Sequence, residues 1–140
     1  MATRLVMPQP GQIVPGVTNG DTSWNNIKKL WTVNGDATIV AWTCSPEIAN
    51  DICRTEKLCG GLRKLVLDRS QGSRNNSLEI LRSGLGDRVK LISCHAKIAV
   101  CGPLVMVGSG NLSRSKGIEI YQLVNSVELA DWWRNEIDKW

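Results

Sequence analysis

Residues suited to phosphate chemistry lie in two short motifs of this 140-residue chain. His95, the single histidine, is followed by Lys97, and the run Gly108-Ser109-Gly110-Asn111 comes shortly afterwards. A histidine can attack phosphorus or transfer a proton near neutral pH. Lysine supplies positive charge, serine and asparagine donate neutral hydrogen bonds, and glycines let backbone N–H groups approach an anion. These types predict phosphoryl chemistry without the carboxylate cluster of a magnesium site.

A predicted hairpin brings the two motifs together. Strands are expected over 97–100 and 104–107, joined by the turn Cys101-Gly102-Pro103. His95 and Lys97 are two residues apart on the first strand, so both side chains would lie on one face. Pairing of the strands places the Gly108–Asn111 loop beside them. A lone histidine is more often structural, but these neighbours favour a catalytic role.

The remaining pattern predicts an α/β domain. Further strands are expected over 38–43, 65–67, 89–92 and 118–124, and helices over 24–31, 46–58, 78–81 and 128–140. The first half alternates strands and helices, which predicts right-handed crossovers, and the second half adds antiparallel strands. We therefore expect a mixed, mostly parallel sheet with helices on both faces.

The chain is expected to form one domain preceded by an arm. Residues 1–20 are rich in proline and glycine and predict an irregular N-terminal arm, which leaves 21–140 as the domain. Hydrophobic residues make up 42% and charged residues 21%, a balance typical of globular proteins. No internal repeat is present, so the candidate site occurs once per chain.

Positive charge is concentrated in the middle of the sequence. The net charge is +4, but residues 63–116 hold ten basic residues against three acidic ones, a local excess of +7. Such a stretch favours nucleic acid as a partner. The alternative is that these charges only solvate helix faces.

Cysteines and apolar segments bear on the compartment. The five cysteines are odd in number and none has C-x-x-C spacing, which indicates neither a disulfide framework nor a zinc site. No apolar run is long enough to span a bilayer, and the N-terminus lacks the apolar stretch of a secretion signal. We expect a cytoplasmic protein without a membrane partner, in a bacterium or an infected host.

The motifs resemble those of the phospholipase D superfamily, whose signature is H-x-K-x4-D followed by G-S-x-N. His95-Ala96-Lys97 and Gly108-Ser109-Gly110-Asn111 match it, and Glu119 falls where many members carry a glutamate. The similarity covers about 100 residues and extends to the expected closing helix. One departure is clear, because Gly102 stands where the family has its aspartate.

The resemblance implies a homodimer without a metal ion or other cofactor. Members need two facing motifs, and this chain carries one, as in the short endonucleases of the family. His95 of one subunit would form a phosphohistidine while His95 of the other acts as general acid. Lys97, Ser109 and Asn111 would hold the phosphate oxygens, and Glu119 would orient the imidazole or else be a surface residue.

Three basic residues are candidates for binding flanking phosphates: Arg74, Arg114 and Lys116. Solvated surface positions are the alternative for each. Trp24, Trp31 and Trp42 are expected in the core, whereas Trp132, Trp133 and Trp140 suit packing or a dimer interface.

Three functions stay open from the sequence. The first is a metal-independent endonuclease, favoured by the basic middle and the single motif. The second is a nucleic-acid-binding homologue with impaired catalysis, favoured by the missing aspartate. The third is a phospholipid phosphodiesterase, against which the short chain and the lack of a membrane-binding stretch argue.

Overall fold

The computed structural model of the chain describes residues 5–19, 23–113 and 117–140. The helices and strands of these residues are, in chain order, β1 (Ile13–Asn19), α1 (Ser23–Asn34), β2 (Ala37–Val40), α2 (Pro46–Cys59), β3 (Leu62–Asp68), α3 (Ser77–Leu85), β4 (Val89–Ile92), β5 (Ile98–Cys101), β6 (Leu104–Gly108), β7 (Ile118–Asn125) and α4 (Val127–Asp138). Two 3₁₀ helices, η1 (Arg69–Ser73) and η2 (Gly86–Arg88), complete them.

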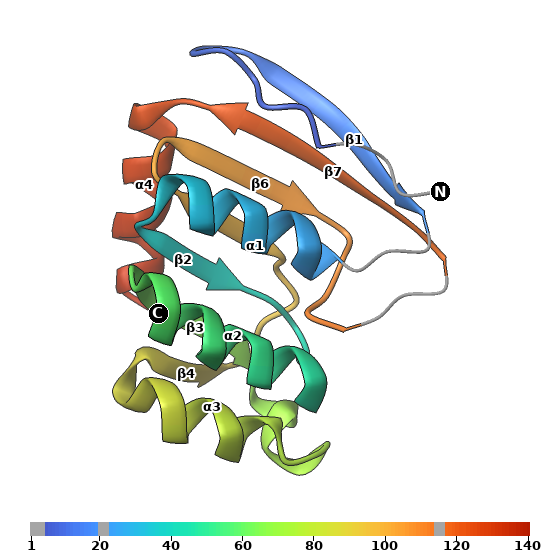
Figure 1. Cartoon of the computed structure of the whole chain (residues 1–140), viewed down its shortest axis with the longest axis vertical. Coiled ribbons are helices and arrows are strands. Elements are labelled where there is room, and N and C mark those ends of the chain that lie inside the picture. Colours follow the sequence, from blue (N-terminus) through green and yellow to red (C-terminus); the bar gives the residue numbers. More distant parts are fainter. Residues whose placement is uncertain (1–4, 20–22, 114–116) are drawn as a thin grey trace.

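The strands of the described residues form one seven-stranded mixed sheet in the order β1-β7-β6-β5-β2-β3-β4 (Figure 1). The mixed sheet predicted from the sequence is confirmed, but its expected parallel majority is wrong. Only β2–β3 and β3–β4 pair in parallel, while β1–β7, β7–β6, β6–β5 and β5–β2 are antiparallel. The crossovers end at β4, and the chain then returns to the other side of β2, where β5, β6 and β7 pair in antiparallel fashion.

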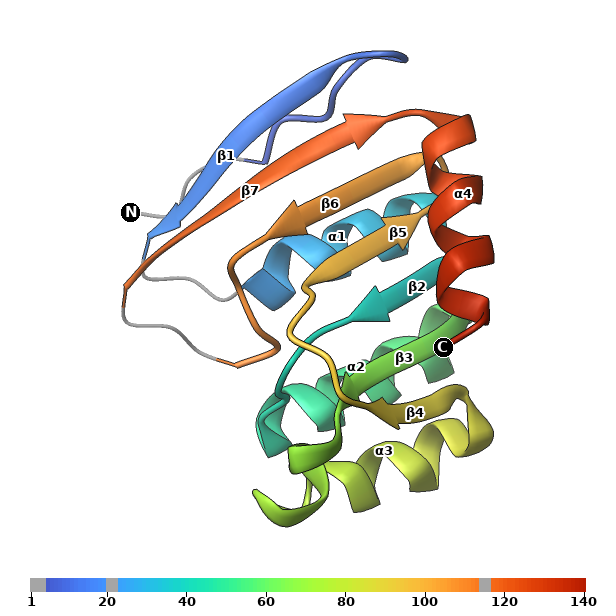
Figure 2. The same cartoon turned by 180° about the vertical axis from the view of Figure 1, so that it is seen from behind.

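Helices cover both faces of the sheet, as predicted. α1, α2 and α3 lie on one face and α4 lies on the other (Figures 1 and 2). The first face packs Trp24, Leu30 and Trp31 of α1 into the larger hydrophobic cluster. The second packs Ala130 and Ile137 of α4 against the sheet. These two cores hold the central strands rigidly and so fix where the strands end.

Serine caps set the starts of α2 and α4. The Ser45 hydroxyl accepts a hydrogen bond from the N–H of Ile48 at 3.3 Å, and Pro46 occupies the first turn, as the sequence predicts. The Ser126 hydroxyl accepts from the N–H of Leu129 at 3.2 Å. Each cap satisfies an amide that the helix itself leaves without a partner.

The expected irregular arm over residues 1–20 is partly wrong, because residues 13–19 form β1, an edge strand paired with β7. Pro15 is tolerated there since an edge strand can lack one ladder donor. Gly16 lies directly opposite Tyr121, and a Cβ atom at Gly16 would fall 2.0 Å from the Tyr121 ring. The missing side chain therefore leaves room for this ring across β1.

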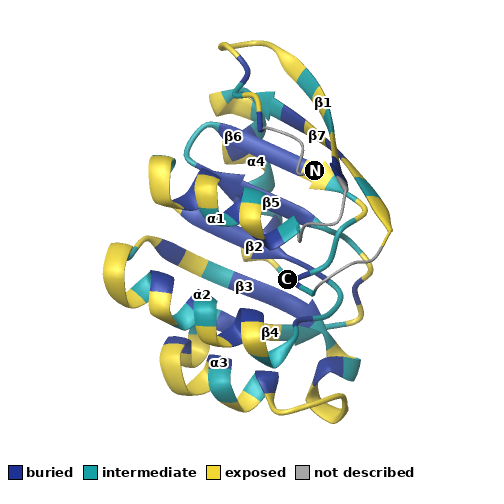
Figure 3. Ribbon diagram, turned by 45° about the vertical axis from the view of Figure 1, so that its right-hand side comes forward, coloured by how far each residue is buried: buried dark blue, intermediate teal, exposed yellow. Residues whose placement is uncertain are grey.

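Burial separates the centre of the sheet from its ends. Every residue of β2 and β5 is buried, whereas β1 and the helix surfaces expose many residues (Figure 3). The segment 69–73 is the 3₁₀ helix η1. It follows β3 directly. Polar side chains from η1 and from the carboxyl ends of β2 and β3 therefore meet at the edge of the sheet where these strands end.

Candidate active site

The β5–β6 hairpin brings the two motifs side by side, as predicted. Ile98 pairs with Val107, and the Gly108 N–H donates to the Lys97 carbonyl at 3.3 Å. His95 and Lys97 themselves precede β5 in an irregular segment, so their expected place on a strand is wrong. The β2–β5 ladder begins only at Ile98, and nothing extends the strand before that residue.

His95 stacks on Trp42, which follows β2. The two ring centroids are 5.0 Å apart and the ring planes differ by 21°. His95 is exposed and Trp42 is half-buried, so the expected place of Trp42 in the core is wrong. Within the described residues the imidazole nitrogens have no hydrogen-bond partner, which leaves them open to a substrate.

Asn111 ties the second motif to the same place. Its Oδ1 accepts from the N–H groups of Trp42 at 3.1 Å and Thr43 at 3.4 Å. Next to it, the Leu112 N–H donates to the Thr43 carbonyl at 3.1 Å, and Leu112 accepts from the Ser45 N–H at 2.8 Å. The loop after β6 therefore runs along the chain that leaves β2.

Ser109 and Glu119 contact each other. The Ser109 hydroxyl donates to the Glu119 carboxylate and accepts from the Ile120 N–H at 3.0 Å. Among the described residues, the carboxylate of Glu119 thus bonds Ser109 and not His95. The arrangement fixes the Ser109 hydroxyl hydrogen on Glu119, so the serine would have to exchange this bond before donating to a phosphate.

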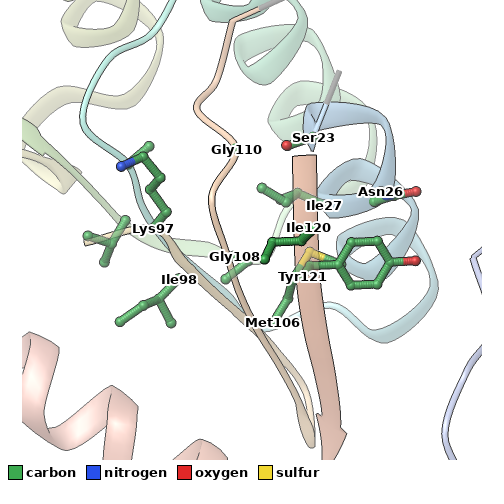
Figure 4. Close-up of a pocket in the computed structure, with 13 residues that line it drawn as sticks. Ser23, Asn26, Ile27, Lys97, Ile98, Met106, Gly108, Gly110, Ile120 and Tyr121 are labelled. Atoms are coloured by element: carbon green, nitrogen blue, oxygen red, sulfur yellow. The ribbon is translucent and has the colours of Figure 1, made fainter. Parts of the chain in front are cut away.

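Lys97 lines a small pocket that the first turn of α1 also lines. Its side chain lines this pocket with Ser23, Asn26 and Gly110 (Figure 4). The Lys97 ammonium donates to the His95 carbonyl at 3.1 Å. The Lys97 ammonium is therefore bound to the main chain of His95.

A carboxylate that sequence reasoning missed organises this edge. Asp68, the last residue of β3, accepts from the Ser70 hydroxyl at 2.6 Å, the Ser70 N–H at 3.0 Å and the Cys94 N–H at 3.0 Å. These donors hold the pKa of Asp68 far below its ordinary value. The Ser70 hydroxyl has the largest effect, the two backbone N–H groups follow, and the Trp42 indole adds a smaller one. Asp68 ends a strand that pairs in parallel with β2, so it lies beside the end of β2. A carboxylate at the end of a predicted buried strand is the sequence signal that could have identified it.

Arg74 is the predicted phosphate-binding residue that the structure places at this edge. Its Nε donates to the Ser70 hydroxyl at 3.2 Å, and its guanidinium carbon lies 4.6 Å from the centre of the Trp42 ring. Arg74 is exposed. Arg114 and Lys116 lie outside the described residues.

Comparisons with known proteins identify the fold. Nuc from Salmonella typhimurium, a phospholipase D family member, matches with a TM-score of 0.72 and 16% identity over 91% of this chain and 92% of that chain. NucT from Helicobacter pylori gives 0.63 and 12% over 91% and 95%. The chain has the phospholipase D fold.

Other comparisons extend or limit this result. TrmBL2, an archaeal chromatin protein whose structure shows a novel mode of DNA binding, matches with a TM-score of 0.58 and 10% identity over 89% of this chain and 51% of that chain. No family model and no curated protein matches the sequence. The resemblance seen in the motifs is thus supported by the phospholipase D fold and not by overall sequence similarity.

The departure of the sequence from the phospholipase D signature falls far from the site. Gly102 lies in the β5–β6 turn, at the opposite end of β5 from Lys97, with φ of +56°. Its carbonyl accepts from the buried Arg134 guanidinium, which also lies 3.5 Å from the Asp36 carboxylate. A carboxylate at Gly102 would therefore lie among these turn contacts and not beside His95.

Two further findings concern metals and membranes. In residues 5–19, 23–113 and 117–140, histidine, cysteine and acidic side chains form no group of three that could hold a metal ion. The described helices include none with the length and apolar character needed to cross a membrane.

Proposed function

We propose that the protein is a metal-independent phosphodiesterase, namely a homodimeric endonuclease that works through a phosphohistidine. The observation that carries the proposal is the convergence of His95, Lys97 and Asn111 at one edge of a phospholipase D fold. The imidazole nitrogens, which have no hydrogen-bond partner among the described residues, supply a nucleophile, and the ammonium and the amide supply donors for a phosphate.

The proposed reaction has two steps. In the first, a nitrogen of His95 attacks phosphorus, and the bond from phosphorus to the leaving oxygen breaks. The second subunit's His95 gives its proton to that oxygen. In the second step this histidine takes a proton from water, whose oxygen attacks phosphorus and releases the first His95. Lys97 and Asn111 stabilise the charge on the phosphate oxygens in both steps.

An exposed apolar strip supports the dimer. Val17 pairs with Ile120 and Val107 pairs with Gln122, so these side chains share one sheet face beyond α4. Val107 is 45% and Ile120 62% exposed. A groove in the strip is lined by both residues and by Ser109. A second copy seated there would cover the apolar side chains and bring its own motif close to this one.

Nucleic acid is the proposed substrate. The excess of +7 over residues 63–116 and the placement of Arg74 beside Trp42 favour a polyanion. A second candidate is a nucleic-acid-binding protein without cleavage, which the match to the DNA-binding TrmBL2 favours. The missing aspartate supports that candidate less strongly, because Gly102 lies at the end of β5 opposite to the His95 segment.

The test is cleavage of single-stranded DNA, duplex DNA and RNA in excess chelator by purified wild type, His95→Ala and Lys97→Ala. We expect wild type to cleave at least one substrate and both variants to lose the activity. Lys90→Ala, at an exposed lysine of β4, is the matched control for charge and should cleave normally. Equal cleavage by wild type and His95→Ala would contradict the proposal, and salt-dependent binding without cleavage would support the second candidate.

A further inference from the structure

The imidazole of His95 has an unusual environment for a proposed nucleophile. It is exposed and lies in the irregular segment between β4 and β5. Glu119, which was expected beside it, bonds Ser109 instead. In the described part of the chain, the stack on Trp42 is the contact that restrains the imidazole plane. A free imidazole would rotate about its side-chain bonds and lose the orientation that attack requires.

Hydrogen bonds to its main chain hold Trp42 in place. Its N–H donates to Asn111 at 3.1 Å, and its carbonyl accepts from the Asp68 N–H at 3.1 Å. Both bonds come from segments distant in the sequence. The Trp42 backbone is therefore bonded to β3 and to the loop after β6.

The Asp68 carboxylate connects the two ring-bearing segments. It accepts from the N–H of Cys94, the residue before His95, while the Asp68 N–H bonds Trp42. On the other side Asp68 accepts from Ser70, whose hydroxyl accepts from Arg74, and the Arg74 guanidinium lies over Trp42. These contacts form a closed circuit of four residues, Trp42, Asp68, Ser70 and Arg74. His95 joins it through its stack on Trp42 and through the bond from the Cys94 N–H to Asp68.

We propose that Trp42 is a positioning residue that holds the plane of the His95 imidazole, and that Asp68 sets the spacing between the two rings. The inference rests on the proposed function, in which His95 attacks phosphorus. In this inference Trp42 orients the nucleophile, a role that goes beyond hydrophobic packing and that none of the motif residues has. An aromatic face is required, because an aliphatic side chain would contact the imidazole without fixing its plane.

The single histidine makes the geometry directly measurable. The His95 imidazole stacks on the Trp42 indole. The indole ring current should therefore move the proton NMR resonances of the carbon-bound imidazole protons upfield of those in an unfolded peptide at equal pH. Trp42→Leu should abolish the displacement, and Trp42→Phe should keep part of it. Trp132→Leu is the matched control, since Trp132 is 55% exposed on α4 and stacks edge-on with Trp133.

Kinetics complete the test on the same proteins. We expect Trp42→Leu to lower kcat about 10- to 100-fold with a smaller change in KM, and Trp42→Phe to recover most of the rate. Unshifted ring protons in wild type, or an active enzyme whose kcat is unchanged in Trp42→Leu, would overturn the inference. A shifted ring in a wild type that cleaves nothing would overturn the proposed function but leave Trp42 as the residue that orients His95.

Discussion

Asn111 binds the backbone of Trp42 through a 3.1 Å hydrogen bond between residues 69 positions apart in the chain. Asn111 Oδ1 acts there as a structural acceptor, while its Nδ2 has no hydrogen-bond partner among the described residues and could donate to a phosphate. The asparagine of the second motif thus serves both the fold and the proposed chemistry, and substitutions can separate the two roles.

Asn111→Ala should destabilise the protein by about 1–3 kcal/mol, because two partly buried N–H groups lose their acceptor. Asn111→Asp keeps an acceptor and should stay close to wild type in stability. It should still lose cleavage, because it has no amide donor and adds negative charge beside the phosphate. Urea unfolding and a cleavage assay measure the two effects; equal destabilisation by both variants would refute the structural role.

Asp68 should make stability depend on pH in acid. Its donors lower the pKa of the folded-state carboxyl below the ordinary 3.8, which the unfolded chain retains. The contribution is therefore complete above about pH 4 and is lost as the pH falls through the lowered folded-state pKa. Asp68→Asn should be less stable than wild type near pH 7, and the difference should shrink toward pH 2.

Urea midpoints across this range would measure the Asp68 effect. Asp87→Asn, at an exposed carboxyl, is the control. A gap between wild type and Asp68→Asn that stays constant with pH would show that the carboxylate charge contributes nothing.

Gly102→Asp should not improve cleavage, although it restores the aspartate of the phospholipase D signature. The positive φ of +56° and a Cβ position 3.1 Å from Asn34 Cβ predict a loss of stability of about 1–3 kcal/mol. Gly102→Ala shares this backbone strain and serves as the control. If Asp raised kcat above that of Ala, the turn would be coupled to the site after all.

Ile120→Lys should convert the proposed dimer into monomers and abolish cleavage, because it places a charge in the exposed apolar strip. Analytical ultracentrifugation over a range of concentrations would measure this change. Leu58→Lys, at a 78% exposed position on α2, should leave the dimer intact. A fully active wild type that sediments as a 15.4 kDa monomer would rule the dimer out.

Local sequence patterns predicted the hairpin because both of its strands and the intervening turn lie within a few residues. They also predicted α2, whose Ser45 cap and Pro46 announce its start. β1 escaped prediction because Pro15 and Gly16 obscure the alternation of an edge strand that depends on its pairing with β7. Edge strands of this kind are defined by a neighbour and not by their own residues.

The motif residues of the candidate site were predicted by type, but their partners were not. Trp42 and Asp68 follow different strands, and their meeting with His95 depends on the order β5-β2-β3 in the sheet. The sequence pattern predicts the strands but does not give this order. The same limit explains Glu119, which was expected at the imidazole and instead bonds Ser109.

The missing side chain of Gly16, whose place the Tyr121 ring takes, has a consequence for how the sheet's outermost strand is aligned. Slippage of β1 by one residue would bring Pro15 or Val17 opposite the Tyr121 ring, and a shift by two would bring Val14 or Thr18. Each of these residues carries a Cβ atom, for which the Tyr121 ring leaves no room, so every such misalignment produces a clash with Tyr121. The Tyr121 side chain alone thus sets the register of β1, which pairs with a strand on only one side.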